Sequence, residues 1–277
     1  MRSLTKDIEI VSNKRARIDL KELWLYRELL YYLSLRDIKV RYKQTFLGAG
    51  WAILQPLLAA AIFTLFFNRV ARIPSGADNV PYPVFAFLGI MLWTMFSGAL
   101  TGVSNSLVAS QGLITKVYFP RIIPLLSATA LSIVDLFFAS LAFIVLLLLY
   151  GIMPHPAGIL IAGPAVLLMI VAALGVGTFF ASLNVKYRDV RTALPFLIQI
   201  LFFMTPVIYP ITLIPERFQI FAYLNPATGA ITAIKSGLFG QPINWTGFMI
   251  SWCVAVLSLI FGIWYFQRTE KNFVDVI

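Results

Sequence analysis

Charged residues are scarce in this sequence. Of its 277 residues only 12% are Asp, Glu, Lys or Arg, whereas 60% are hydrophobic and the mean hydropathy is +0.85. Ordinary soluble domains have about 25% charged and about 45–50% apolar residues. A soluble globule of this length would therefore have too little polar surface, and the composition excludes a soluble enzyme and a disordered tail.

Groups that ligate metals or form covalent links are equally rare. The one cysteine, Cys253, permits no intrachain disulfide, and we expect it to be a small buried apolar residue because it lies in an apolar run. The one histidine, His155, stands in the stretch MPHPA and is expected in a turn. The sequence contains no HExxH and no GxxxxGK[ST] phosphate loop, so neither a metal site nor an ATP site of that kind is predicted.

The charges that are present gather near the N-terminus. Residues 1–45 hold 17 of the 34 charged groups, and residues 46–267 hold only 13. This predicts a cytosolic head over residues 1–45 and a transmembrane domain over residues 46–277. The first apolar run begins near Phe46, too late and too long for a signal peptide. We therefore expect the chain to enter the membrane by its own first span.

Long apolar runs predict an all-α polytopic membrane protein with six spans. A bilayer core is crossed by about 20 apolar residues, and six segments reach that length: roughly 46–68, 83–105, 124–150, 157–182, 193–213 and 246–267. With this topology 18 basic residues lie on the side of both termini and 4 on the other side, which places both termini in the cytoplasm. The net charge of +10 then reflects topology and contact with anionic headgroups, and no nucleic acid is expected as a partner.

The head contains one amphipathic stretch, KELWLYRELLYYLS, over residues 21–34. At about 100° per residue one broad arc is formed by Leu25, Tyr26, Leu29, Leu30, Tyr32 and Leu33. We expect an N-terminal interface helix lying on the membrane; a helix packed on a partner protein is the alternative. Just before the first span, a helical or extended access segment carries Arg36, Lys39, Arg41 and Lys43.

Prolines interrupt the region between the fifth and sixth spans. The fifth span is punctuated by Pro195, Pro206 and Pro210. Two apolar pieces follow, at about 216–224 and 227–239, and each is too short to cross a membrane. Asn225 and Pro226 suit the cap and first turn of the second piece. We expect a re-entrant hairpin on the outer side, with an interfacial loop as the alternative.

Within the spans, Asp135 is the one ionisable residue predicted at depth, about 11 residues and hence roughly 16 Å into the third helix. Such an acid indicates function, but a packing contact with the nearby Ser132 or Ser140 is equally open. Gly98 and Gly102 form a GxxxG pattern that permits close helix approach. Aromatic rings offer flat faces to sugar C–H groups, and candidates to line a sugar path, or simply to pack, are Phe63, Phe66, Phe67, Phe196, Phe202, Phe203 and Tyr209.

Two connections on the predicted cytoplasmic side combine basic and aromatic residues. LITKVYFPRIIP, which contains Lys116 and Arg121, suits docking of a soluble partner as well as ordinary anchoring at the membrane. LNVKYRDVRTALP repeats the mixture with Tyr187 beside Lys186, Arg188 and Asp189.

Four stretches in order resemble one family. RDIKVRYKQTFLGAGWAILQPLL, VYFPRIIPL, NVKYRDV leading into PFLIQILFFMTPVIYP, and YLNP are together similar to the permease subunit of bacterial ABC exporters of the polysaccharide type. The chain most resembles lipopolysaccharide O-antigen permeases of the ABC-2 type, and the resemblance covers its whole length. It implies the ABC-2 (type V exporter) fold, with an interface helix, six spans and outer gate helices between spans five and six.

The resemblance also implies partners. Two copies would form a homodimer with a central channel in the bacterial inner membrane, and two separate ABC ATPase subunits would bind ATP and Mg²⁺ at the cytosolic face. The chain itself would hold no cofactor and would not be an enzyme. The substrate would be a polysaccharide on undecaprenyl diphosphate. The residues implied in coupling to the ATPase are Lys116, Val117, Tyr118, Phe119, Pro120 and Arg121, together with Lys186, Tyr187, Arg188 and Asp189 in the segment 184–190.

Two more sites follow from the same resemblance. The basic residues of the access segment would lie where the lipid diphosphate enters. The outer gate would be the pieces 215–224 and 226–239, with Pro215, Phe218, Phe221, Tyr223, Asn225 and Pro226.

No pattern in the sequence identifies the exported polymer. A capsule or teichoic acid export permease therefore remains an alternative, as does a small-ligand exporter of the same fold. A membrane enzyme acting on lipid-linked sugar is disfavoured, because the chain has no paired carboxylates and no usable histidine.

Overall fold

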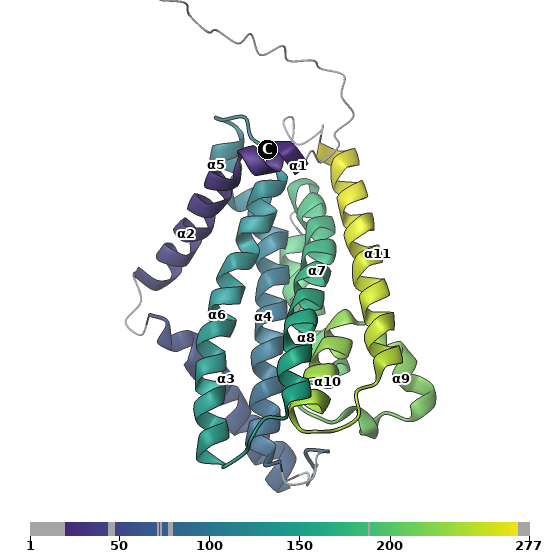
Figure 1. Cartoon of the computed structure of the whole chain (residues 1–277). Helices are drawn as coiled ribbons and strands as arrows, with labels where there is room; N and C mark the ends of the chain where they lie inside the picture. Colours follow the sequence, from purple (N-terminus) through teal and green to yellow (C-terminus); the bar gives the residue numbers. More distant parts are fainter. Residues whose placement is uncertain are drawn as a thin grey trace, which may run out of the picture.

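The computed structural model describes residues 20–43, 48–70, 72, 74–76, 80–187 and 189–270, and within them every regular element is a helix. This confirms the all-α prediction. Most of the long helices run between two ends of the molecule (Figure 1): the head end, where α1 and α5 lie, and the opposite end, where α9 lies. In chain order the helices are α1 (Leu20–Leu25), α2 (Arg27–Lys43), α3 (Gly50–Phe63), the π-helix η1 (Thr64–Val70), α4 (Tyr82–Ala109), α5 (Gln111–Ile114), α6 (Ile122–Leu149), α7 (Pro156–Lys186), α8 (Val190–Met204), the 3₁₀ turn η2 (Ile211–Leu213), α9 (Glu216–Tyr223), α10 (Pro226–Leu238) and α11 (Trp245–Thr269).

Among the described residues, five helices are long and apolar enough to cross a membrane. They are Gly50–Asn68, Tyr82–Ala109, Ile122–Leu149, Pro156–Lys186 and Trp245–Thr269. Five of the six predicted spans are therefore confirmed, although Phe46, at the predicted start of the first, lies outside the described residues.

The fifth predicted span, 193–213, is wrong in extent. Its helix α8 has 15 residues, about 22 Å at 1.5 Å per residue, which is shorter than a hydrocarbon core of about 30 Å. The backbone leaves the helix over residues 205–210, here called the break segment, and returns as η2. Pro206 and Pro210 have no backbone N–H to donate, so they cannot complete helical hydrogen bonds.

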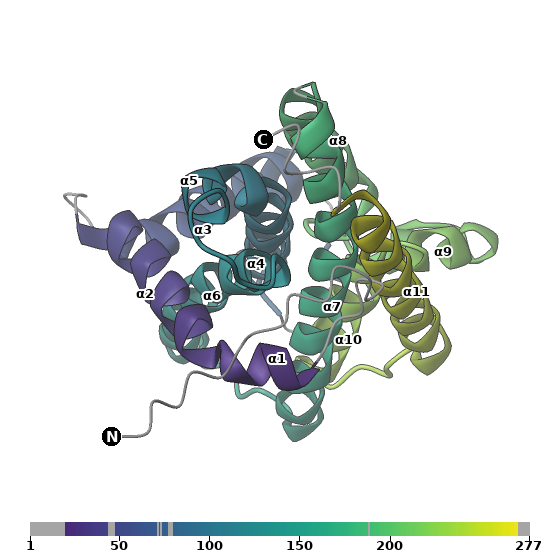
Figure 2. The same ribbon diagram turned by 90° about the horizontal axis from the view of Figure 1, so that it is seen from above.

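Helix α4 lies at the centre of the molecule. Seen from above (Figure 2), α2, α3 and α6 lie on one side of it and α7, α10 and α11 on the other. The predicted GxxxG contact is confirmed, because Gly98 faces Ser132 of α6 and a Cβ on Gly102 would lie 3.2 Å from the carbonyl oxygen of Ala128. Such close packing needs small residues at the contact.

The head helices pack on the bundle by one face. Leu29, Leu30 and Leu33 contact a cluster that includes Phe119 and Ile123, and α2 continues along α6 (Figure 1). The access segment is therefore helical. Leu25 and Tyr32 of the predicted arc do not pack on the bundle and are exposed. A turn at Tyr26 separates α1 from α2, so a single helical period does not run through both.

Two further expectations have opposite outcomes. His155 does lie in a turn, where its Nδ1 accepts the backbone N–H of Ala157 at 3.3 Å and caps α7. Cys253 is exposed on α11, so its predicted burial is wrong. In a membrane helix the outward face is apolar as well, and an apolar run does not by itself indicate burial.

Candidate transport sites

Only part of the first predicted coupling segment is exposed to solvent. Between α5 and α6 the exposed residues are 115–118, here called the coupling tip, and the Tyr118 side chain is 82% exposed at the head end. Glu22 of α1 raises the pKa of the Tyr118 hydroxyl through its negative charge. The coupling tip therefore offers Lys116, Val117 and Tyr118 to the solvent beside the head helices.

The other residues of this segment hold it in place. Phe119 is buried against Leu33 and Ile123. Arg121 Nη1 donates to the backbone oxygen of Glu270 at 2.5 Å, and its Nε lies 3.9 Å from the Glu270 carboxylate. Burial raises the pKa of the Glu270 carboxyl, and the charge of Arg121 partly opposes that shift. Phe119 thus ties the segment to the head, and Arg121 ties it to the end of α11.

The second predicted coupling segment lies at the end of α7, which Asn184 joins to α4. The Asn184 side-chain amide donates to the backbone oxygen of Ser104 at 3.1 Å and to Asn105 Oδ1 at 3.0 Å. Beyond it Lys186 and Tyr187 are exposed, with the Lys186 Nζ 5.0 Å from the Tyr187 ring centre.

After this pair, Asp189 directly precedes α8, and Arg188 lies outside the described residues. The chain therefore places both predicted coupling segments at the head end, because α4 and α7 both end there (Figure 1).

The basic access residues divide into paired and exposed groups. Arg36 contacts Asp37 at 2.8 Å, and Arg41 lies 3.3 Å from the carboxylate of Asp135. Lys39 and Lys43 are exposed, and in the part of the chain that the structure describes neither forms an ion pair. These two lysines are the cations most accessible to an anionic headgroup.

The Asp135 carboxylate bonds to residues of the access segment rather than to Ser132 or Ser140. Its carboxylate accepts the hydroxyl hydrogen of Tyr42 and pairs with Arg41, both at the end of α2. Ser132 instead faces Gly98, and Ser140 donates to a backbone oxygen of its own helix. A small cavity beside Asp135, also lined by Gln55 and Thr94, has about 10 Å³, room for roughly one water. The acid therefore anchors the end of α2 halfway along α6.

Some of the aromatic channel candidates meet across helices. Phe63 lies 5.6 Å from Phe202 between ring centres, and Phe202 lies 5.7 Å from Trp93 of α4. Phe67 extends this cluster through Phe63 at 5.7 Å.

The other candidates border that interior cluster, and the Phe203 ring lies 5.3 Å from the Phe202 ring. Phe66, Phe196 and Phe203 are more than half exposed. Tyr209 donates to the backbone oxygen of Phe203 at 3.1 Å. The predicted set thus contains an interior cluster and an outward-facing group.

The two short helices predicted as a re-entrant hairpin are present. The Asn225 side chain accepts the backbone N–H of Ala227 at 3.1 Å and caps α10, with Pro226 in the first turn, as predicted. Helix α10 packs on α4, α7 and α11 and is largely buried, so the interfacial-loop alternative is wrong for α10.

The shorter helix α9 carries the other predicted gate residues. Pro215 precedes it, Phe218 and Phe221 contact each other with their rings 6.5 Å apart and stay largely exposed, and Tyr223 is buried.

Sequence reasoning missed Lys235, which it counted only among the four basic residues of the side opposite the termini. The side chain is only 5% exposed. Its Nζ donates to the carbonyl oxygens of Pro206 at 3.1 Å and Val207 at 2.6 Å, and lies 3.6 Å from the ring centre of Phe85. The lysine therefore supplies hydrogen-bond donors to the break segment.

Three other residues fix the same segment. The Tyr82 hydroxyl donates to the Ile208 carbonyl at 2.6 Å, and Asn225 Nδ2 donates to Thr205 Oγ1 at 2.7 Å. Gly89 allows the close approach, because a Cβ there would lie 2.1 Å from the Val207 oxygen. The available signal was a lone lysine in an apolar helix that follows a proline-rich break.

Comparisons with known proteins agree with this architecture. Residues 28–239 match the family model described as ABC-2 type transporter. The chain is 26% identical over 251 residues to the O-antigen export system permease protein RfbA of Klebsiella pneumoniae, covering 90% of this chain and 95% of that one. It is 30% identical to RfbA of Myxococcus xanthus, covering 78% and 82%, and 25% identical to the polysialic acid transport protein KpsM of Escherichia coli, covering 76% and 83%. The family model spans more than half of the sequence, and the chain belongs to the ABC-2 type transporter family of membrane proteins.

Proposed function

We propose that this chain is the membrane subunit of an ATP-driven exporter that moves O-antigen polysaccharide, carried on undecaprenyl diphosphate, across the bacterial inner membrane. Its relatives are permease proteins of export systems, so the chain is a transport component and not an enzyme. The observation that carries the proposal is the similarity to O-antigen permeases along 90% and 78% of the chain. Capsule export is the second candidate, favoured by the similarity to KpsM.

Physical chemistry explains why such a substrate needs a protein path. A hydroxyl taken from water without a hydrogen-bond partner costs several kcal/mol, and an unpaired charge costs more. A glycan with a diphosphate therefore cannot cross lipid unaided. One protomer of this size is too small to enclose a polymer channel, and we propose a homodimer whose channel takes up aromatic residues such as Phe66 and Phe203, which are exposed in the single chain.

In this proposal the head end faces the cytoplasm, as do both termini, and two separate ATPase subunits bind there. Lys39 and Lys43 attract the lipid diphosphate to the access segment. The coupling tip binds the ATPase and is joined to the head through Phe119 and to α11 through Arg121 and Glu270. Closure of the ATPase pair thereby moves both the access segment on α2 and the last span, α11.

The experiment tests the coupling tip. Lys116→Glu combined with Tyr118→Ala changes two exposed side chains and leaves the buried Phe119 and the paired Arg121 intact. We expect this variant to insert normally, to lose co-purification with the proposed ATPase partner, and to lose export of the polymer to the cell surface.

The control is Met153→Ala, because Met153 is 92% exposed at the opposite end. This control should retain the ATPase and full export. Normal ATPase retention in the Lys116 and Tyr118 double variant would contradict the coupling assignment. Unchanged surface O-antigen after deletion of the chain, with loss of another surface polymer, would favour the capsule alternative.

A further inference from the structure

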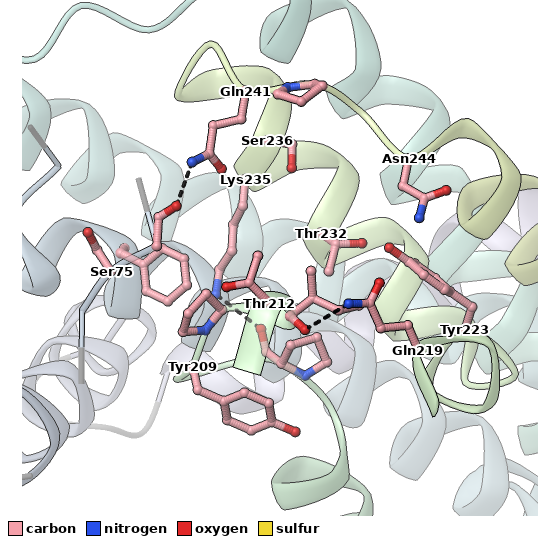
Figure 3. A pocket seen from close by; sticks show the side chains of 16 residues that line it. Ser75, Tyr209, Thr212, Gln219, Tyr223, Thr232, Lys235, Ser236, Gln241 and Asn244 are labelled. Carbon is pink, nitrogen blue, oxygen red and sulfur yellow. Dashed lines mark hydrogen bonds between the residues drawn. The ribbon is translucent and has the colours of Figure 1, made fainter. Parts of the chain in front are cut away.

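The end of the molecule opposite the head holds a cavity with apolar and polar lining, which includes Tyr209 and Tyr223 of the predicted channel and gate sets. It has about 250 Å³ and lies between α10, the break segment, α9 and the loop 241–244. Figure 3 shows Lys235 reaching from α10 toward the segment that carries Thr212, with Gln219 and Tyr223 nearby. The volume is smaller than the roughly 300–1,000 Å³ of sites for drug-sized ligands. The cavity therefore suits one small polar unit.

Some polar groups around the cavity are already used by the fold. Thr232 donates to the Thr228 carbonyl at 2.7 Å, and Asn244 Oδ1 accepts the N–H of Gly247 at 2.9 Å. The side-chain amide nitrogen of Gln241 donates to the Gly76 carbonyl at 2.6 Å, and that of Gln219 donates to the Ile214 carbonyl at 3.0 Å. These bonds fix the walls of the cavity and hold both glutamine side chains in one orientation.

Other polar groups have no hydrogen bond within the part of the chain that the structure describes. They are the hydroxyls of Thr212 and Ser236 and the amide oxygens of Gln219 and Gln241. Two hydroxyls and two fixed carbonyl-type acceptors are thus presented to a guest. A guest that matches them must carry several hydroxyl groups, because the amide oxygens can only accept.

The floor and one wall supply flat apolar surface. The Nζ of Lys235 lies over the Phe85 ring and directs its N–H groups to the carbonyls of Pro206 and Val207. The lysine therefore fixes the floor of the cavity. The rings of Phe85, Tyr209 and Tyr223 also line the cavity. Fixed acceptors, hydroxyls and aromatic faces in one small cavity match a sugar ring, whose hydroxyls are polar and whose C–H faces are apolar.

From this juxtaposition we propose that the cavity is a binding site for a single sugar unit of the exported polymer as it leaves the membrane at the outer side. The amide oxygens of Gln219 and Gln241 accept sugar hydroxyls, the hydroxyls of Thr212 and Ser236 bond to sugar oxygens, and Tyr209 packs on the ring face. This inference rests on the proposed function and deepens it.

The test is photo-crosslinking in cells that make the polymer and contain the complete exporter. p-Benzoylphenylalanine replaces Thr212 in one variant and Ser236 in another, and the matched control carries it in place of Met249, which is 55% exposed on the outward face of α11. We expect polymer attached to the chain at the two cavity positions, several-fold above the Met249 control, and none in cells that cannot make the polymer.

The outcomes separate the two hypotheses. If export requires the chain but crosslinking at both cavity positions equals that of the control, the sugar site is overturned and the proposed function stands. If polymer export is unchanged without the chain, the proposed function fails first.

A second measurement serves if the bulky probe disturbs folding. Thr212→Cys in a Cys253→Ser background, which leaves one thiol, should react several-fold more slowly with a membrane-impermeant maleimide when the cells make polymer. Equal labelling rates would overturn the site.

Discussion

At the residue scale, single polar side chains stabilise irregular backbone and charged side chains. Lys235 supplies donors to two carbonyls of the break segment, where prolines remove helical hydrogen bonds. Asp135 supplies the carboxylate that Arg41 and Tyr42 share at the end of α2. Each residue joins an irregular or terminal segment to a long helix, so its removal should act locally before it affects the whole fold.

Lys235→Met should lower the stability of the protein. The substitution leaves the buried carbonyls of Pro206 and Val207 without donors, which costs about 1–3 kcal/mol for each unsatisfied group. Removal of the buried amino group, which is itself desolvated, offsets part of that cost, and we expect a net loss of about 1–3 kcal/mol, seen as a lower thermal midpoint in detergent. Lys39→Met, at an exposed position of α2, should leave the midpoint unchanged. Equal midpoints for both variants would contradict the role of Lys235.

Asp135→Asn should loosen the end of α2. The substitution removes a charge-assisted bond worth about 1–3 kcal/mol and leaves Arg41 without its carboxylate. Trypsin should therefore cut after Lys39 or Arg41 faster than in the parent protein. Asp37→Asn is the matched control, because its partner Arg36 is exposed and such pairs contribute little. Identical cleavage rates in both variants would contradict the anchoring role.

At the element scale, glycines set how closely the long helices approach. A Cβ on Gly262 of α11 would lie 2.2 Å from the Gly175 oxygen of α7, and a Cβ on Gly237 of α10 would lie 2.8 Å from the Cα of Gly158. Helix α7 therefore touches α11 and α10 backbone to backbone. Without water to provide a hydrophobic driving force, such contact is what holds membrane helices together.

Gly175→Ala should separate α7 from α11. The new Cβ would lie 2.5 Å from the backbone nitrogen of Leu259, which cannot move aside as a side chain can. We expect a loss of at least about 1–3 kcal/mol, the usual cost of overpacking, measured by thermal unfolding. Gly163→Ala lies on the same helix with no atom within 4 Å and should be neutral or slightly stabilising. An unchanged midpoint for Gly175→Ala would refute the contact.

The tie between the coupling segment and α11 should depend on pH through Glu270. Burial raises the pKa of this carboxyl above its ordinary 4.5, so the folded protein favours the neutral form. Stability should be highest below pH 4.5 and should decline as the pH rises through the raised value, because the unfolded group ionises first. Glu270→Gln keeps the backbone oxygen that Arg121 binds and should remove this decline. A parent protein that loses stability on acidification over that range, relative to the variant, would contradict the assignment.

At the scale of the whole molecule, the fold brings distant segments to two ends. Both predicted coupling segments lie at the head end beside α1, and the short helices and the sugar cavity lie at the other (Figure 1). The central helix α4 connects the two, since Asn105 contacts the end of α7 and Tyr82 holds the break segment. This arrangement places the proposed ATPase contacts at one end of the molecule and the proposed exit of the polymer at the other.

In the absence of its ATPase partner, the chain should not transport polymer. Purified chain in liposomes with lipid-linked polymer and ATP should give no export, and addition of the ATPase partner should restore it. Polymer that is protected inside the vesicles from added glycosidase, resolved by chain length, is the readout. Transport by the chain alone would refute the proposed mechanism, while transport of a capsule polymer in preference to O-antigen would redirect the substrate assignment.

The sequence by itself determined the membrane class, five of the spans, the two short helices α9 and α10 and the cap at Asn225, because each depends on local composition, period or cap chemistry. It also put the two predicted coupling segments on one side of the membrane, since basic loops mark one side. Only the tertiary structure decided which side chains remain accessible. Phe119 and Arg121 are held by contacts with residues distant in the chain, Cys253 faces outward, and Lys235 is buried. These outcomes depend on pairs such as Lys235 and Val207, 28 residues apart, and no local pattern specifies a partner at that distance.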